Sequence, residues 1–571
     1  MTILSIPSTT EASLMVLADI EAVEFSNLLD PATVTFLNTQ CDGIQIRNDV
    51  IFRGSTQPNL VVVNGGSVDA SGWQFETFNS HYDTITFNGS SAADTITGSS
   101  KADSISGNQG DDILSGGNGA DLISGQRGSD IITGGRGADE LLGGKRNDTF
   151  IYTDAAELAA GETIDGGGGA DDAISIAGDG LYQFNLAVVS NVERLRYEDN
   201  GGTGAAAQLA PDMLGHIGFS VIESNNRTDT LTVEGVVVDL SAVVFENWTR
   251  NDVINITGTA ASDILTGSDE DDHFFITAGV DVMMGNNGSD VFVVNDSLPS
   301  GTIIDGGGSN QDVLDMTGAT VMPAFNIFEL RFTSIQSVEI VKMSLLANAF
   351  TAIDDASFQD VLTVVGRSAA ASGMSSLAIY GASMDYSGLA FEDWNDNDQI
   401  SLVGSPTSDD IITGTSVDDV ITPRAGMDII DGGDGNDTLY GQEDDDTISG
   451  SDGDDKIIGG TGRDVLNGGN GADGFDYYDI TESEAGTQRD IIEDFTSGED
   501  QLTFVNMSTP VFSYIGEDPF TAIGDTEARI RLINQSNITI VEIDVDGDGT
   551  RDMQIELTGL VTLTADDFNI V

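Results

Sequence analysis

Large apolar side chains recur at every ninth residue in part of this chain, and polar and glycine-rich stretches separate them. The first such set is Ile96, Ile105, Leu114, Ile123, Ile132, Leu141 and Phe150. The segments between glycine and aspartate turns hold about four to six residues, which suits a short β-strand and is too short for a helix. The pattern therefore predicts a predominantly β chain in which each strand buries one large apolar residue.

An aspartate stands two residues before each of these apolar positions, and the same spacing returns in two later parts of the chain. The first run comprises Asp94, Asp103, Asp112, Asp121, Asp130, Asp139 and Asp148. The second run comprises Asp263, Asp272, Asp281 and Asp290. The third run comprises Asp410, Asp419, Asp428, Asp437, Asp446, Asp455, Asp464 and Asp473. A fixed period of this kind indicates a repeated structural unit rather than chance.

Each unit of the first run also begins with a glycine five residues before the aspartate, from Gly89 to Gly143. Glycine permits the positive φ of a tight turn, and carboxylate and turn carbonyl groups offer the hard oxygen ligands that calcium prefers. Two units would form one coil of a parallel β-roll, which places the aspartates of alternate repeats on the same edge. Neighbouring coils could then share a calcium ion, so all the aspartates of the three runs are candidate metal ligands.

Complete GGxGxD motifs occur at Gly116 to Asp121, Gly134 to Asp139, Gly432 to Asp437, Gly459 to Asp464 and Gly468 to Asp473. In these motifs the chain resembles the RTX family of calcium-binding nonapeptide-repeat proteins. The resemblance implies an all-β fold, a parallel β-roll or β-solenoid, that binds several Ca²⁺ ions as its cofactor.

Three turns depart from the motif. Ile276 and Pro423 stand where a turn glycine is expected, and Gly441 to Asp446 reads GQEDDD without the second glycine. We expect these turns to bind calcium weakly or not at all, and the second run to act mainly as a structural bridge.

The charge balance also points to a need for cations. With 95 acidic and 21 basic residues the formal net charge is -74, and such self-repulsion should oppose compaction until cations neutralise it. If adjacent turns share ions and every turn binds, the three runs would take up roughly thirteen calcium ions, so we expect about a dozen. The protein would still be acidic, which makes nucleic acid and anionic membranes poor partners.

Metal would also have to replace cross-links in this chain. The single Cys41 excludes an intramolecular disulfide, and we expect it to be a small buried apolar residue. No run of about 18 apolar residues is present, so membrane insertion is not expected.

A second, longer repeat lies between the aspartate runs, because the segment from Asp69 to Asp83 matches those from Asp239 to Asp252 and from Asp385 to Asp398. The chain is therefore expected to hold three tandem units and a C-terminal β-rich cap. The predicted segments are a strand-rich solenoid segment (1–88), a first repeat block (89–155), a second solenoid segment (156–257), a second block (258–298), a third solenoid segment (299–404), a third block (405–480) and a C-terminal cap (481–571).

The C-terminal segment resembles the cap behind RTX blocks in type I secreted proteins, and a solenoid needs a cap to cover its open end. Asp544, Asp546, Asp548 and Asp552 could converge on one calcium ion, or could form an acidic hairpin turn without metal. The ending, acidic and then apolar, resembles an uncleaved type I export signal. The resemblance implies the type I secretion machinery as a partner and an extracellular or cell-surface location, and the first 25 residues lack the basic and apolar regions of a cleavable signal.

No motif for catalysis accompanies the repeats. HExxH and GxSxG are absent, and His81, His216 and His273 are far apart in the sequence. The recurring aromatics Phe78, Trp248 and Trp394 could stack on sugars, but a repeated position in the solenoid core explains them better.

These features favour a secreted, non-catalytic calcium-binding solenoid, with no catalytic residues and with a structural or adhesive role as in a surface layer or matrix. Calcium should drive its folding, and its acidic edges should associate with each other or with a cell-surface glycan through calcium. The alternative is a secreted polysaccharide-active enzyme, of the epimerase or lyase type, carried on an RTX scaffold.

Overall fold

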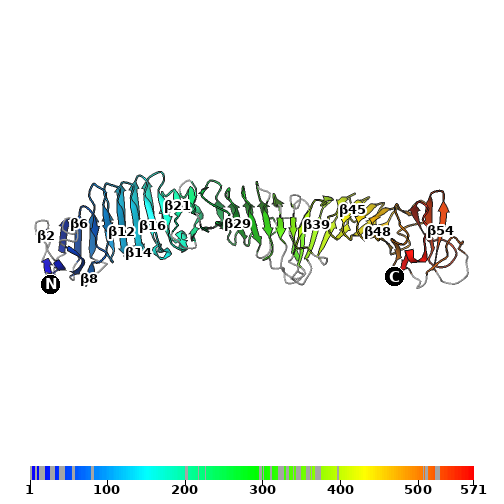
Figure 1. Ribbon diagram of the computed structural model, residues 1–571, viewed down its shortest axis with the longest axis horizontal. Helices are drawn as coiled ribbons and strands as arrows, with labels where there is room; N and C mark the ends of the chain where they lie inside the picture. Colours follow the sequence, from blue (N-terminus) through cyan, green and yellow to red (C-terminus); the bar gives the residue numbers. More distant parts are fainter. Residues whose placement is uncertain are drawn as a thin grey trace. The chain divides into compact units, whose positions relative to one another are not determined.

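The structure is a computed structural model of the chain, shown in Figure 1. It describes residues 3–6, 10–11, 20–25, 32–37, 46–54, 58–78, 83–199, 204–215, 218–225, 227–294, 299, 301–308, 311–318, 327–329, 334–338, 340–342, 349–354, 361, 363–366, 375–394, 398–505, 507, 512–520 and 528–571. The chain forms two compact units, one with Met1–Phe275 and Met283–Asp290 and the other with Ile276–Val282 and Val291–Val571. Cys41, His81 and His216 lie outside the described residues.

In the first unit the chain alternates between two parallel sheets, so that every second strand of the first aspartate run joins the same sheet (Figure 1). One sheet contains β7 (Val68–Asp69), β10 (Thr95–Thr97), β12 (Ile113–Asn118), β14 (Ile131–Arg136), β16 (Thr149–Tyr152), β18 (Ala173–Ile176), β21 (Arg194–Tyr197), β23 (Val221–Glu223) and β26 (Val244–Glu246). The other contains β2 (Thr10–Glu11), β4 (Ala32–Leu37), β6 (Asn59–Asn64), β9 (Thr84–Asn88), β11 (Asp103–Ser106), β13 (Leu122–Arg127), β15 (Glu140–Lys145), β17 (Thr163–Gly168) and β20 (Val188–Ser190).

The strand registers show that two repeats make one coil. Ile113 pairs with Ile131 in one sheet, and Leu122 pairs with Glu140 in the other, in each case one coil further along. Along β12 and β13 more buried and more exposed residues alternate, because successive side chains point to opposite faces. The expected parallel β-roll is confirmed.

The core is renewed once per repeat by the large apolar residue. Ile96, Leu114, Ile132 and Phe150 from one sheet and Ile105, Ile123 and Leu141 from the other are at most 1% exposed. Burying each such side chain contributes about 1.5–3 kcal/mol. The apolar positions predicted from the sequence are therefore the core.

The second unit has the same arrangement around the third aspartate run. One sheet includes β42 (Gln399–Val403), β44 (Asp419–Thr422), β46 (Thr438–Glu443), β48 (Lys456–Thr461), β50 (Gly474–Tyr477), β52 (Gln501–Phe504) and β57 (Phe568–Ile570). The other includes β40 (Ser383–Asp385), β43 (Ile411–Thr413), β45 (Ile429–Asp434), β47 (Thr447–Asp452), β49 (Val465–Asn470), β51 (Asp490–Ile492), β56 (Met553–Thr558), β55 (Ile538–Asp544), β54 (Ala528–Gln535) and β53 (Phe512–Tyr514).

The C-terminal part of the second unit ends the parallel coils with an antiparallel sheet. Strands β54, β55 and β56 form two antiparallel pairs, and β56 also pairs in parallel with β51. The last coil therefore does not present an open strand edge at β51. This part is the expected β-rich cap, while the predicted division of the chain into seven segments stays a prediction.

Helical structure is minimal in the described residues, where each helical turn is a three-residue 3₁₀ turn: η3 (Ala155–Glu157), η4 (Phe184–Leu186), η5 (Pro211–Met213) and η7 (Ala565–Asp567). None of the helices in this described part has the length and apolar character that a membrane crossing requires.

Candidate calcium sites of the aspartate ladders

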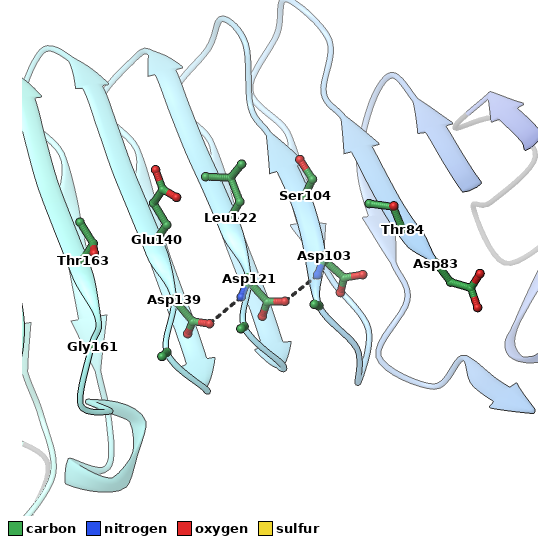
Figure 2. Close-up of a pocket in the computed structure, with 13 residues that line it drawn as sticks. Asp83, Thr84, Asp103, Ser104, Asp121, Leu122, Asp139, Glu140, Gly161 and Thr163 are labelled. Carbon is green, nitrogen blue, oxygen red and sulfur yellow. Dashed lines mark hydrogen bonds between the residues drawn. The ribbon is translucent and has the colours of Figure 1, made fainter. Parts of the chain in front are cut away.

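The aspartates of each run form a ladder along the edge of the coils. The backbone N–H of Asp103 donates to Oδ1 of Asp121 at 2.8 Å, and the N–H of Asp121 donates to Oδ1 of Asp139 at 2.8 Å (Figure 2). The same contact joins Asp94 to Asp112, Asp112 to Asp130, Asp130 to Asp148, Asp272 to Asp290, Asp410 to Asp428, Asp419 to Asp437, Asp428 to Asp446, Asp437 to Asp455, Asp446 to Asp464 and Asp455 to Asp473. Each carboxylate thus ties its turn to the turn one coil earlier.

The second carboxylate oxygen has no such partner in most of these turns. Oδ2 of Asp121 is buried without a hydrogen-bond donor, and it lies against Gly116 at the start of the same turn. A Cβ added to Gly116 would collide with this oxygen and with the carbonyl oxygen of Gly134 in the next coil. Other aspartates of the first and third runs with an unpartnered, buried Oδ2 are Asp112, Asp130, Asp139, Asp148, Asp428, Asp437, Asp446, Asp455, Asp464 and Asp473.

Burial makes these carboxylates costly to ionise without a cation. It raises the pKa of Asp121, Asp437 and Asp446 to about 8, although the ladder hydrogen bond opposes the shift. The charges of neighbouring ladder carboxylates contribute to the same upward shift of the pKa. A buried charge needs a partner, and the groups that converge here are carboxylate and carbonyl oxygens. This donor set fits Ca²⁺, which takes oxygen ligands in flexible geometry.

The first two turns of each block, here called the leading turns, differ from those that follow. In all six of them the residue after the glycine is serine or threonine, and its N–H or hydroxyl donates to the aspartate. Oδ2 of Asp103, for example, accepts from the N–H of Ser99 at 2.6 Å, and Oδ1 accepts from the Ser99 hydroxyl at 3.1 Å. Corresponding bonds join Ser90 to Asp94, Thr259 to Asp263, Ser268 to Asp272, Ser405 to Asp410 and Thr415 to Asp419.

In the leading turns the backbone N–H of the serine or threonine therefore donates to the oxygen that later turns leave unpartnered. Oδ1 of Asp272 and Oδ1 of Asp419 nevertheless remain buried without a donor. Aspartate spacing alone makes all ladder turns equivalent, and a GS or GT pair does not by itself identify a leading turn. Gly450 and Ser451 precede Asp455, whose Oδ2 stays buried without a donor. Hydroxyl and amide donors stabilise a carboxylate without metal. We infer that the leading turns depend less on calcium than the turns behind them.

Replacing Asp121 by asparagine should remove at least one ion, whereas the same change at Asp103 should leave the ion count unchanged. Asparagine keeps an acceptor for the ladder bond but loses the second carboxylate oxygen, and a bound ion contributes about 2.7 kcal/mol at 100 times its Kd. Native mass spectrometry at millimolar calcium measures the ion count directly. Melting temperature alone would not separate the two variants, because Asp103→Asn loses a hydrogen bond to Ser99 while Asp121→Asn loses an ion, and both losses destabilise the fold. An equal ion count in Asp121→Asn and Asp103→Asn would contradict the distinction.

The three irregular turns keep the ladder geometry where the structure describes them. Asp446 and Asp428 retain a buried, unpartnered Oδ2. Gln442, Asp444 and Arg424 adopt the positive φ that glycine usually supplies, at 82°, 81° and 90°, which costs about 1–3 kcal/mol per residue. Asp281, in the turn after Ile276, is 1% exposed. Weak calcium binding at these turns stays a prediction.

The acidic hairpin of the cap brings together three of the four predicted ligands. Asp544, Asp546 and Asp552 each offer an oxygen within 4.8 Å of the others. Asp548 does not join them, because its Oδ1 accepts from the N–H of Thr550 at 2.7 Å and from the Thr550 hydroxyl. These bonds lower the pKa of Asp548. Both oxygens of Asp544 accept N–H groups of the loop, from Gly547 and Gly549, so an acidic turn without metal also accounts for the geometry.

In the described part of the chain the ladders continue directly behind the first and third blocks at aspartates that the nine-residue period does not identify. Asp172 accepts the N–H of Asp148, Asp490 that of Asp464 and Asp500 that of Asp473, over separations of 24, 26 and 27 residues instead of 18. The longer loops before these aspartates break the nine-residue period, which is why the period does not identify them. The signal that could have found them is the buried apolar residue two positions later, at Ile174, Ile492 and Leu502.

A shallow groove of about 490 Å³ runs beside one ladder of the first unit (Figure 2). Asp83, Asp103, Asp121, Asp139 and Glu140 contribute to its lining, together with alanine, glycine, threonine, serine and leucine side chains or backbone. No basic residue lines the described groove. Its chemistry suits cations and would repel an acidic polymer.

The family comparison agrees with this geometry. The RTX calcium-binding nonapeptide repeat family matches residues 88–123, 115–150, 257–292, 407–439, 424–457 and 440–475. No curated protein matches the chain. Among solved structures, the solution structure of the AlgE6R3 subunit from the Azotobacter vinelandii mannuronan C5-epimerase is 27% identical, with 29% of this chain and 79% of that chain covered and a TM-score of 0.17. The three blocks of aspartate ladders in this chain are RTX calcium-binding nonapeptide repeats.

Proposed function

We propose that this protein is a secreted calcium-binding solenoid that folds on calcium outside the cell and serves there as a structural or adhesive component. The observation that carries the proposal is the row of buried carboxylate oxygens without donors, repeated from turn to turn. Each lies against a turn glycine, as Asp121 does at Gly116 and Asp437 at Gly432. Only cations can keep such rows ionised in a folded chain at neutral pH.

Calcium dependence would also couple folding to export. At low intracellular calcium the repelling carboxylates would keep the blocks unfolded, which suits passage through a type I secretion machinery. Millimolar calcium outside would then drive folding by mass action, because binding free energy becomes folding free energy where the site forms only in the folded state.

A structural role fits the described surface better than catalysis does. The groove of the first unit carries carboxylates and no basic side chain in its described lining, so it lacks a cation to hold an acidic glycan. The recurring aromatics pack against neighbouring rings: Phe78 on Phe75 at 5.0 Å, Trp248 on Phe245 at 5.2 Å and Trp394 on Phe391 at 5.2 Å between centroids. These contacts support a packing role, although the three rings are half-buried and do not lie in the core as expected.

Repetition on the outer strand faces supports assembly. The residue after the ladder aspartate points outward, and it is a large apolar residue in corresponding strands of both units. Ile113 and Ile131 are 50% and 37% exposed, and Ile411 and Ile429 are 55% and 51% exposed. A weak contact repeated along each block gains strength through multivalency.

The folded protein should therefore assemble at millimolar calcium rather than remain a single chain. Carboxylates on neighbouring copies repel until cations bridge them, so particle size should rise with calcium and fall again with chelator. Light scattering and electron microscopy across a calcium series measure this. Strictly monomeric particles at millimolar calcium, together with cleavage of an acidic polysaccharide, would overturn the structural role in favour of the polysaccharide-active enzyme.

A further inference from the structure

Asp490 occupies a ladder position outside the nonapeptide repeats. The N–H of Asp464 donates to its Oδ1 at 3.0 Å, just as the N–H of Asp446 donates to Asp464 at 2.9 Å. The matched repeat segments end at residue 475, and Asp490 instead begins β51, the strand that pairs with the cap. Asp490 is thus the first ladder residue contributed by the C-terminal segment to this edge.

The second oxygen of Asp490 is buried and unpartnered. The residue is 0% exposed, and its Oδ2 has no hydrogen-bond donor, as is also true of Oδ2 of Asp464 beside it. The adjacent Arg489 does not neutralise the pair, because its guanidinium binds Glu556 and the carbonyl of Gly486. The hydroxyls of Tyr477 and Ser483 lie near the Asp490 carboxylate and act on it, although neither forms a hydrogen bond of ordinary geometry with Oδ2. Both groups are neutral, so they bring no charge that offsets the two carboxylates.

The two other aspartates that continue the ladder provide an internal comparison. Asp172 and Asp500 accept the same ladder bond through Oδ1, at 2.7 and 3.1 Å. Their Oδ2 atoms, however, accept the N–H groups of Gly169 at 3.1 Å and of Thr496 at 2.6 Å. Among these three residues Asp490 alone keeps the unpartnered oxygen that marks the turns inside the blocks.

We propose that Asp464 and Asp490 hold one further calcium ion, and that this ion fastens the C-terminal sheet to the last coils of the third block. The proposal rests on calcium binding by the ladders, as proposed above. Two buried carboxylates side by side without a basic partner require either a shared proton or a cation, and the repeated oxygen-only surroundings favour calcium.

The fastening follows from the contacts of Asp490 with the cap. Its N–H donates to the hydroxyl of Ser483 at 2.8 Å, and that hydroxyl donates to the carbonyl of Gln554 in β56. Asp490 is also paired with Ile555 in the parallel register of β51 and β56. An ion at Asp464 and Asp490 would therefore order β51 and β56 together, so that the docking of the antiparallel sheet becomes calcium-dependent.

The test compares Asp490→Asn with Asp172→Asn and Asp500→Asn in the full-length protein at millimolar calcium. Native mass spectrometry should find one ion fewer in Asp490→Asn than in the unaltered protein, and the unaltered count in the two control variants. Asparagine keeps an acceptor for the N–H of Asp464, so the ladder bond itself survives. An unaltered ion count in Asp490→Asn would overturn the proposal and indicate a shared proton instead.

A second measurement on the unaltered protein keeps the test independent of how the variant folds. Hydrogen exchange across a calcium titration should show the amides of β51 and β56 becoming protected together. Equal protection of these strands in chelator and in calcium would overturn the fastening role. Failure of the broader proposal looks different, since the unaltered protein would then bind no calcium at all.

Discussion

Withdrawing calcium at neutral pH should unfold the repeat blocks of both units. In the first and third runs each interior turn buries a carboxylate oxygen that no hydrogen bond satisfies, as at Asp121 and Asp437. A bound ion contributes about 2.7 kcal/mol at 100 times its Kd, so a few ions equal the whole stability of a typical domain, about 5–15 kcal/mol. The coils are linked one to the next by ladder bonds, which should make the loss cooperative within a block.

Far-ultraviolet circular dichroism of chelated protein titrated with calcium measures this loss, which should remove most of the strand signal of the blocks. Magnesium at the same concentration should restore little, because its small octahedral shell fits a carbonyl-rich turn badly. Hydrogen exchange of a strand outside the blocks, such as β21, provides an internal control. Arg194 in β21 forms ion pairs with Asp171, Glu223 and Glu246, so these charges are balanced without metal. A chelated protein that is fully β and melts cooperatively would show that the ladders are not calcium-dependent.

The sequence predicted the coil because one spacing is kept without interruption through each block. A constant separation of 18 residues between ladder partners places every aspartate on an edge and every apolar residue in the core, and no knowledge of distant contacts is needed. Where the loop grows longer, the period no longer identifies the ladder residue. Asp172, Asp490 and Asp500 therefore emerge only from the strand register.

Whether a carboxylate oxygen is available to a metal depends on nearby hydrogen-bond donors, which the spacing of the aspartates does not reveal. Ser99 satisfies Asp103, while Asp121 in a complete GGxGxD motif keeps a free oxygen. In the cap the hydroxyl of Thr550 donates a hydrogen bond to Asp548, although the alternating spacing suggested four equivalent ligands. In both cases the deciding group is a serine or threonine beside the acid, so aspartate spacing alone overestimates the number of equivalent ligands.

In the absence of calcium, acid should stabilise the blocks that neutral pH destabilises. Burial raises the pKa of Asp121, Asp437 and Asp446 to about 8 in the folded chain, against about 3.9 for an aspartate in an unfolded chain. Between these values the folded state binds more protons than the unfolded state. The free energy of unfolding therefore falls as pH rises, with the contribution present in full below about pH 4 and lost as pH passes about 8.

Circular dichroism and hydrogen exchange in chelator between about pH 5 and pH 8 should accordingly show more folded repeat at pH 5. Saturating calcium should reverse the trend, because protons compete with the ion for the same oxygens and metal affinity falls as the ligands protonate. Acidification also reduces the repulsion between exposed carboxylates, which stabilises the folded chain in addition to protonation of the buried ladder. A high-salt series separates these two effects, because salt screens the exposed charges. A chelated protein that is better folded at pH 8 than at pH 5 would mean that the ladder carboxylates are not buried as the coils place them.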